Sequence, residues 1–215
     1  MRRADPNPAW SQDYRVGLLL SSVVIDTRVR PRVTRFLEPI GKALAGLGVT
    51  PTVMTSVGLA IVIAGSVIIS TGALRMGAIV VLIGSILDGL DGSVARASGT
   101  ETARGAFLDS AFDRLGEIAA FAGLGVAVAR ETGDEWILLL IILAIGGAML
   151  VPYIRSRAEV EGFNGKGGLM GRAERVLLFT MGLIAGYVEP MLWVFVVLVW
   201  ITALMRFIDT YRSFE

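Results

Sequence analysis

The fold of this chain is decided by residues 88–113, which read DGLDGSVARASGTETARGAFLDSAFD. Each end of this stretch carries a pair of aspartates: Asp88 and Asp91 are three residues apart, and Asp109 and Asp113 are four apart. On an α-helix, both spacings place the two side chains of a pair on one face. Because apolar sequence flanks the stretch on both sides, the pattern predicts two helical arms, each carrying two carboxylates, joined by a short polar turn.

Four carboxylates in an apolar environment need neutralisation, because each isolated charge costs several kcal/mol there. The chain has no His and no Cys, so zinc and iron sites lack their usual ligands. An all-carboxylate site suits Mg²⁺ or Mn²⁺, and two such ions would offset the four charges. The alternative is a structural ion network in which the aspartates pair with nearby arginines, namely Arg96, Arg104 and Arg114.

The spaced pattern D-x2-D-G-x2-A-R-x8-G-x3-D-x3-D resembles the signature of the CDP-alcohol phosphotransferase family, and every fixed position is present. The resemblance implies a membrane-embedded enzyme that transfers a phosphatidyl group from a CDP-activated lipid to an alcohol and releases CMP. On this basis we expect Asp88, Asp91 and Asp109 to hold the metal ions. We expect Asp113 to bridge to them and to act as general base on the acceptor hydroxyl, as in two-metal in-line displacement.

A set of CDP-lipid contacts is expected around the aspartates. Gly89 and Gly92 leave a helix face without side chains, which would let a nucleotide approach the backbone closely. Helix packing is the alternative interpretation of these two glycines. The resemblance adds four further donor-binding residues, which are Thr52, Thr55, Arg96 and Thr102. Thr52 departs from the family pattern, because many members carry Asn or Asp at that position.

A second informative region covers residues 153–175, where basic residues flank a glycine-rich link. It resembles the corresponding loop of the actinobacterial phosphatidylinositol phosphate synthases within the family. In those enzymes, the residues equivalent to Arg155, Arg175 and Arg206 bind the phosphate of the incoming inositol phosphate. Taken alone, basic residues at the ends of membrane spans are also ordinary topology signals.

Composition places the chain among integral membrane proteins: 54% of its 215 residues are hydrophobic, and its mean hydropathy is +0.68. We expect an all-α, six-helix membrane bundle, with each helix long enough for a ~30 Å hydrocarbon layer. The expected spans lie near residues 53–70, 74–95, 105–129, 136–154, 173–187 and 191–208. Residues 49–215 form this domain, 31–48 an interfacial amphipathic helix, and 1–30 an amino-terminal extension.

The distribution of basic residues predicts the orientation in the membrane. On the side of the membrane that holds the amino terminus, the segments outside the expected spans carry nearly all of the 20 Lys and Arg residues. The segments on the opposite side carry only Arg75 and Arg130. This asymmetry predicts that both termini and the active site face the cytoplasm. We therefore expect a multi-pass protein of the cell membrane.

The sequence thus predicts transfer of a phosphatidyl group from CDP-diacylglycerol to an inositol phosphate, forming phosphatidylinositol phosphate. Glycerol 3-phosphate is the alternative acceptor, which would make the chain a phosphatidylglycerophosphate synthase. A cation transporter with intramembrane carboxylates is the alternative from another class. We expect membrane lipid as a partner, a homodimer because the family is generally homodimeric, and no nucleic acid.

Overall fold

The computed structural model describes residues 39, 43, 46, 48–99, 102–165 and 167–214. The expected extension over residues 1–30 and most of the expected interfacial helix over 31–48 lie outside these residues. The described residues form helices and no strand, so the chain is all-α. The helices are α3 (Pro51–Ser70), α4 (Leu74–Asp88), α5 (Asp91–Ser98), α6 (Ala103–Glu131), α7 (Glu135–Val160), α8 (Arg172–Ala185) and α9 (Val188–Arg212).

Helices α3 and α4 form an antiparallel pair with their backbones in close contact. A Cβ atom added to Gly65 of α3 would lie 2.9 Å from the carbonyl oxygen of Gly77, and one added to Gly84 of α4 would lie 2.9 Å from that of Gly58. Such distances leave no room for a side chain at these positions. Four glycines therefore set the separation of the two helices, in the manner of small residues between membrane helices.

The expected second span, residues 74–95, is interrupted in the structure. Helix α4 ends at Asp88, and the N–H of Leu90 bonds to the carbonyl of Leu87 at 3.1 Å, which tightens the last turn. Leu90 and Val94 are buried against Met54 at the start of α3. Burial of these side chains turns α5 away from the axis of α4, so Asp88 and Asp91 lie on either side of a break and not on one helix face.

Helices α6 and α7 begin where their sequences provide N-caps. The side chain of Thr102 accepts a hydrogen bond from the Gly105 N–H at 3.0 Å and starts α6. Asp134 accepts from the N–H groups of Trp136 and Ile137 and starts α7. Capping by Ser, Thr, Asp and Asn satisfies backbone donors that the first helical turn leaves unpaired.

The core between α6, α8 and α9 centres on three aromatic rings. The ring of Phe121 lies 4.6 Å from that of Phe179 and 4.9 Å from that of Phe195, measured between centroids, and all three side chains are buried. Tilted and edge-on pairs of this kind are favourable arrangements of aromatic rings. This cluster fixes α8 against α6, which matters for the site because both helices contribute charged residues to it.

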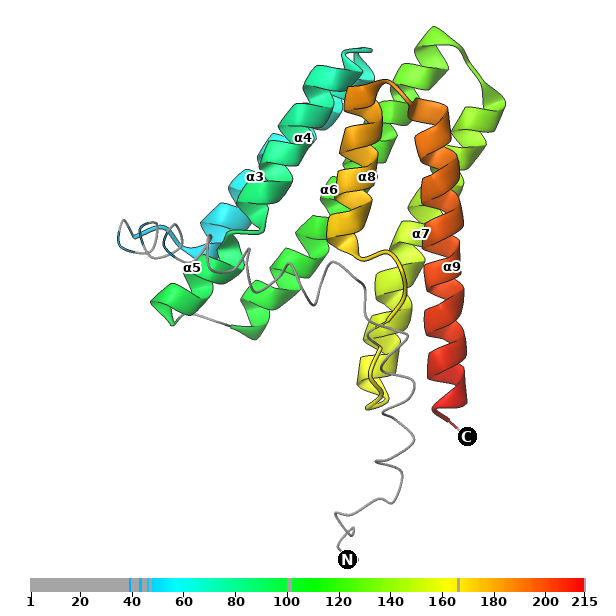
Figure 1. Ribbon diagram of the computed structural model, residues 1–215. Helices are drawn as coiled ribbons and strands as arrows, with labels where there is room; N and C mark the ends of the chain where they lie inside the picture. The colour runs from blue at the N-terminus through cyan, green and yellow to red at the C-terminus, as the bar shows by residue number, and fades with distance from the viewer. Residues whose placement is uncertain are drawn as a thin grey trace, which may run out of the picture.

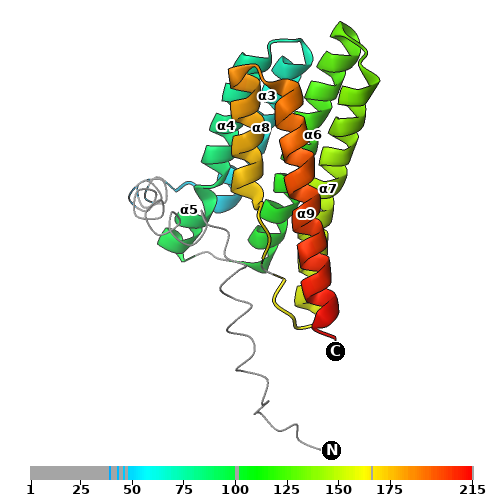
Figure 2. The same cartoon turned by 45° about the vertical axis from the view of Figure 1, so that its right-hand side comes forward.

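Successive long helices run in alternating directions, so their ends gather at two poles (Figures 1 and 2). One pole contains the start of α3, the end of α4, α5, and the starts of α6 and α8, along with the ends of α7 and α9. The Asp-rich stretch and the glycine-rich link both lie at this pole. The opposite pole holds the three short connections at residues 71–73, 132–134 and 186–187.

Three helices, α3, α7 and α9, are long and apolar enough to cross a membrane. The structure also has helices at the three other expected places. Two of these are short, since α4 has only 15 residues and α8 only 14. Helix α6 has 29 residues, and its first half carries several charges. Large apolar side chains are exposed along the bundle, including Val67, Ile142 and Leu204. This is the surface expected of helices that face lipid.

Candidate active site

Three of the four predicted metal ligands come together at the pole that holds the Asp-rich stretch. Asp88 ends α4, Asp91 begins α5, and Asp109 lies in the second turn of α6. Each offers a carboxylate oxygen, and these three atoms lie within 4.8 Å of one another. One oxygen of Asp88, Oδ1, is buried and has no hydrogen-bond donor among the described residues. An all-oxygen set with an unpaired buried oxygen fits a hard divalent cation.

Asp91 is held in place by its neighbours. The hydroxyl of Thr55 lies 2.8 Å from Asp91 Oδ2 and 2.9 Å from the carbonyl oxygen of Pro51, so its single proton serves one of the two at a time. The N–H of Gly92 donates to Asp91 Oδ1. Burial raises the pKa of Asp91, and the nearby Asp88 charge raises it further, while these two hydrogen bonds lower it. A carboxylate in this position gains by binding a cation.

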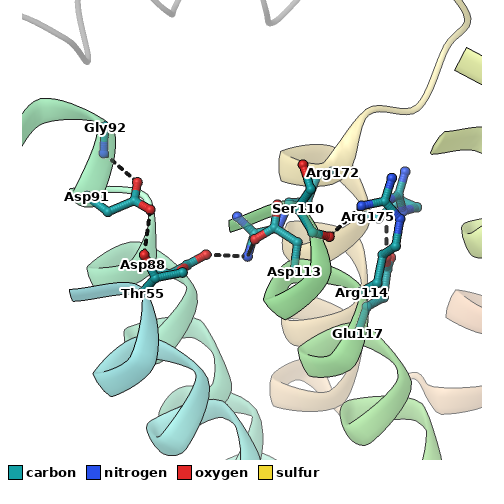
Figure 3. A network of polar contacts seen from close by, with 10 residues as sticks. All are labelled: Thr55, Asp88, Asp91, Gly92, Ser110, Asp113, Arg114, Glu117, Arg172 and Arg175. Carbon is teal, nitrogen blue, oxygen red and sulfur yellow. Dashed lines mark hydrogen bonds and ion pairs between the residues drawn. The ribbon is translucent and has the colours of Figure 1, made fainter. Parts of the chain in front are cut away.

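Asp113, the fourth predicted ligand, is not part of the three-carboxylate group. Its Oδ1 lies 2.7 Å from Nη2 of Arg172, and the same nitrogen lies 2.7 Å from Oδ2 of Asp88 (Figure 3). Arg172 is the first residue of α8. One guanidinium group therefore joins carboxylates from α4 and α6. The sequence analysis assigned Arg172 no role.

The predicted phosphate ligand Arg175 forms a buried ion pair. Its Nε and Nη2 donate to Oε1 and Oε2 of Glu117 at 2.6 and 3.0 Å (Figure 3). Glu117 was also missed by the sequence analysis, although a signal was present. It continues the four-residue spacing of Asp109 and Asp113 along α6, which predicts a third carboxylate on the same face.

The other two predicted phosphate ligands lie near this ion pair. Arg206 donates from Nε to the carbonyl of Gly167 at 2.8 Å and from Nη1 to that of Val151 at 3.0 Å. Arg155 and Arg175 are close enough for their positive charges to act on it. Arg155 itself is exposed, and its Nε contacts Oε1 of Glu159 at 2.9 Å. The three arginines therefore form a basic region between the ends of α7 and α9 and the start of α8.

The glycine-rich link is fixed to α9 beside this basic region. The hydroxyl of buried Thr202 accepts hydrogen bonds from the N–H groups of Leu169 and Met170 at 3.2 and 3.1 Å. Gly168 has a φ of +96°, and a Cβ atom there would collide with the Thr202 side chain. Only glycine fits both the backbone conformation and the space. The link thereby sets the position at which α8 begins, and with it the positions of Arg172 and Arg175.

The predicted CDP-lipid residues lie around the three carboxylates with different roles. Thr55 is buried and supports Asp91, Thr52 is exposed on the first turn of α3, and Thr102 caps α6. Gly89 is exposed, and a Cβ atom there would have its nearest neighbour at 3.5 Å, so helix packing does not require glycine at that position. The side chain of Arg96 lies outside the part of the chain that the structure describes.

A cleft opens between α3, α4, α6 and α8 beside the carboxylates. One wall is charged and consists of Asp88, Asp113, Glu117, Arg172 and Arg175. The deeper wall is apolar, with Val62, Phe121 and Phe179 among its residues. A polar mouth over an apolar interior suits a ligand with a charged head and a hydrocarbon tail.

Comparison with known proteins agrees with this arrangement. The sequence model of the CDP-alcohol phosphatidyltransferase family matches residues 48–208. The archaetidylinositol phosphate synthase of Pyrococcus horikoshii is 32% identical over 190 residues, which cover 88% of this chain and 98% of that protein. The phosphatidylinositol phosphate synthase of Mycolicibacterium smegmatis is 33% identical over 189 residues, which cover 86% of this chain and 83% of that protein.

Solved structures of the phosphatidylinositol phosphate synthase from Mycobacterium tuberculosis have the same fold. The crystal structure with CDP-DAG bound has a TM-score of 0.77 at 30% identity and covers 82% of this chain and 94% of that chain. The crystal structure in complex with manganese and citrate has a TM-score of 0.76 at 30% identity and covers 81% and 88%. The match spans both the Asp-rich stretch and the basic region, and this chain therefore belongs to the CDP-alcohol phosphatidyltransferase family.

Proposed function

We propose that this protein transfers a phosphatidyl group from CDP-diacylglycerol to an inositol phosphate, forming phosphatidylinositol phosphate and releasing CMP. The observation that carries the proposal is the group formed by Asp88, Asp91 and Asp109, whose ligand atoms lie within 4.8 Å of one another beside a charged cleft. The names of the relatives support the acceptor, and the solved neighbours with CDP-DAG and with manganese support the donor and the metal.

The three clustered aspartates would hold Mg²⁺ or Mn²⁺, two ions in the full complement. When bound, these cations polarise the donor pyrophosphate and stabilise the charge on the departing CMP. Thr55 and Gly92 keep the Asp91 carboxylate in position for this role. The open surface at Gly89 leaves space for the nucleotide beside the carboxylates. Thr52, Arg96 and Thr102 are the other proposed contacts of the donor.

Asp113 would act on the acceptor. An acceptor hydroxyl oxygen forms a bond to the phosphorus that carries the diacylglycerol, while the bond from that phosphorus to the CMP oxygen breaks. The hydroxyl proton would pass to Asp113, which is not one of the three clustered carboxylates. CMP leaves with the electron pair of the broken bond.

The acceptor phosphate would be bound by Arg155, Arg175 and Arg206. Guanidinium groups bind phosphate through charge-assisted and often bidentate hydrogen bonds. Within the described residues, Arg206 donates hydrogen bonds to two neutral carbonyl oxygens, and its charge contacts no carboxylate there. Arg175 is oriented by Glu117 and presents the rest of its guanidinium to the cleft.

We further propose that α3, α4, α6, α7, α8 and α9 cross the cell membrane as a six-span bundle, with both termini and the active site at the cytoplasmic face. Three of these helices meet the length and hydropathy of a span, and the basic residues gather at the active-site pole. At that pole, a donor lipid keeps its acyl chains in the bilayer while its pyrophosphate reaches the carboxylates. A second copy of the chain is the proposed partner.

CMP release from CDP-diacylglycerol tests the proposal directly. Purified protein with Mg²⁺ is offered inositol phosphate, glycerol 3-phosphate or free inositol at equal concentration. We expect release with inositol phosphate and little with free inositol. Faster release with glycerol 3-phosphate would reassign the acceptor, and equal efficiency with free inositol would remove the phosphate site. Cation flux into vesicles without any CMP release would favour the transporter.

A further inference from the structure

Arg172 occupies a position that a cation would otherwise fill. Its Nη2 nitrogen lies 2.7 Å from a carboxylate oxygen of Asp88 on α4 and 2.7 Å from one of Asp113 on α6 (Figure 3). The two aspartates belong to different helices and carry like charges, so they repel each other unless a positive group lies between them. The guanidinium provides that positive group.

The contacts of Arg172 overlap with the proposed metal site through Asp88. Oδ2 of Asp88 bonds to Arg172, while the same carboxylate belongs to the group with Asp91 and Asp109. Four aspartates carry four negative charges, and Arg172 offsets one of them. A first divalent cation leaves the site with one net negative charge, but a second makes it net positive while Arg172 remains. The second cation and the guanidinium therefore compete for the same carboxylates.

We propose that Arg172 is a built-in counter-ion, which holds Asp88 and Asp113 together before metal binding and leaves them when the second divalent cation binds. The inference rests on the proposed function, because that function supplies the two cations. It concerns the affinity of the site for metal and not the chemistry of transfer, so the two can be tested separately.

The surroundings of Arg172 allow such a movement. Its side chain is 34% exposed, and it is the first residue of α8, directly after the glycine-rich link. The cap residue Gly171 has no side chain to restrain the first turn. Arg175, one turn further along α8, has a side chain that is only 6% exposed and that donates two hydrogen bonds to Glu117. The first arginine of the helix can move while the second anchors it.

Titration with Mn²⁺, followed by electron paramagnetic resonance of the free ion, measures the affinity. The full chain is compared in detergent micelles as the unmodified protein, Arg172→Gln and Arg114→Gln. Arg114 is the matched control, because it follows Asp113 directly and its Nη1 donates to the backbone carbonyl of Ser110. Of the two Mn²⁺ ions, we expect Arg172→Gln to bind the lower-affinity one about 10-fold more tightly than the unmodified protein does. A change of this size corresponds to the free energy of about one charged hydrogen bond. Arg114→Gln should change that affinity by less than about 3-fold.

Stability without metal gives a second readout. In EDTA, Arg172→Gln should melt below Arg114→Gln, because buried Asp88 and half-buried Asp113 lose their counter-ion. Mn²⁺ should then raise its melting temperature more than that of the unmodified protein. If Arg172→Gln cannot be purified, Arg172→Lys carries the test. Its ammonium does not reproduce the guanidinium geometry, and we expect about 3-fold tighter Mn²⁺ binding.

Unchanged or weaker Mn²⁺ binding in the Arg172 variants, relative to Arg114→Gln, would overturn the inference, since Arg172 would then stay in place or assist the cation. Failure of the proposed function has a different signature. It appears as absence of CMP release from the unmodified protein, whatever its affinity for Mn²⁺.

Discussion

Asp88 connects the two parts of the site. It is 4% exposed, it ends α4, and it belongs to both the three-carboxylate group and the contact with Arg172. Gly58 of α3 lies so close that a Cβ atom there would come within 2.8 Å of the Asp88 Cβ. The carboxylate therefore has little freedom to move, and its position is set by the packing of two helices.

The proposed metal ligands are tested by removing one negative charge at a time. Asp88→Asn, Asp91→Asn and Asp109→Asn should each abolish CMP release, because a hard cation that loses an anionic ligand is poorly compensated. Asp209→Asn, at an exposed position on α9, is the control and should retain activity. CMP release at saturating Mg²⁺ is the measurement, and substantial turnover in any of the first three variants would contradict the assignment.

Asp113 should behave differently from the other three aspartates. As a proposed general base outside the clustered group, it should affect the chemical step more than donor binding. We expect Asp113→Asn to lower kcat by about 10²-fold or more while leaving KM for CDP-diacylglycerol nearly unchanged. Weaker binding of the donor at an intact kcat would instead assign Asp113 a structural role.

The acceptor phosphate is tested through Arg206, whose bonds go only to backbone carbonyls among the contacts described. Arg206→Ala should raise KM for inositol phosphate and leave KM for CDP-diacylglycerol unchanged. A charged hydrogen bond is worth on the order of 1.5 to 3 kcal/mol, so the rise should be roughly 10- to 100-fold. Arg212→Ala, near the end of the same helix, is the matched control. An equal rise for donor and acceptor would argue against a phosphate contact.

Residue spacing predicted the carboxylates better than their partners. The four aspartates are recognisable because their spacing places them at the ends of two neighbouring arms. Arg172 carries no such pattern by itself, since its role depends on how α8 lies against α4 and α6. Glu117 continues the four-residue spacing of Asp109 and Asp113, but its ion pair with Arg175 depends on the same packing. That packing comes from apolar contacts such as Phe121 with Phe179, which no local pattern specifies.

At the scale of the helices, the contact between α3 and α4 positions the site. Gly58 and Gly65 face Gly77 and Gly84, and the backbones approach closely enough for Thr55 to reach Asp91 across the pair. The break after α4 also arises from packing against α3, because burial of Leu90 and Val94 against Met54 outweighs continuation of the helix. The apolar pattern continues across the break, so it predicted one helix over residues 74–95. The surface that causes the break lies on α3, which the pattern of this segment does not reveal.

The glycine contact is tested with two alanine substitutions. Gly84→Ala places a Cβ atom 2.9 Å from the Gly58 carbonyl oxygen, so α3 and α4 must separate. We expect a loss of about 1 to 3 kcal/mol in the free energy of unfolding and a matching loss of CMP release. Gly125→Ala on α6 is the control, because its nearest neighbour would be 3.9 Å away. It should gain about 0.5 to 1 kcal/mol. Equal melting temperatures for the two variants would contradict the close contact.

At the scale of the whole molecule, the bundle has one pole rich in arginine and one pole whose basic residues are only Arg75 and Arg130 among the described residues. Residue composition predicted this polarity, since basic residues are counted directly from the sequence. The helices themselves are harder to judge as spans. In the part of the chain that the structure describes, only α3, α7 and α9 qualify by length and hydropathy. The shorter α4 and α8 begin or end in the site, and α6 carries site carboxylates in its first half. The site thus shortens α4 and α8 and adds charges to α6, so these helices miss the length or the hydropathy of a span.

The proposed orientation is tested with single cysteines, for which the chain is well suited because it contains none. Glu135→Cys lies at the pole of short connections and Glu161→Cys follows α7 at the arginine-rich pole, and both positions are exposed. A maleimide that cannot cross the membrane should label Glu135→Cys in intact spheroplasts and leave Glu161→Cys unlabelled. In inside-out vesicles the pattern should reverse, because the basic pole is retained in the cytoplasm. Labelling of Glu161→Cys from outside would place the carboxylates and Arg172 on the outer face of the membrane. That location would contradict the proposed function, which requires CDP-lipid and phosphorylated acceptor supplied from the cytoplasm.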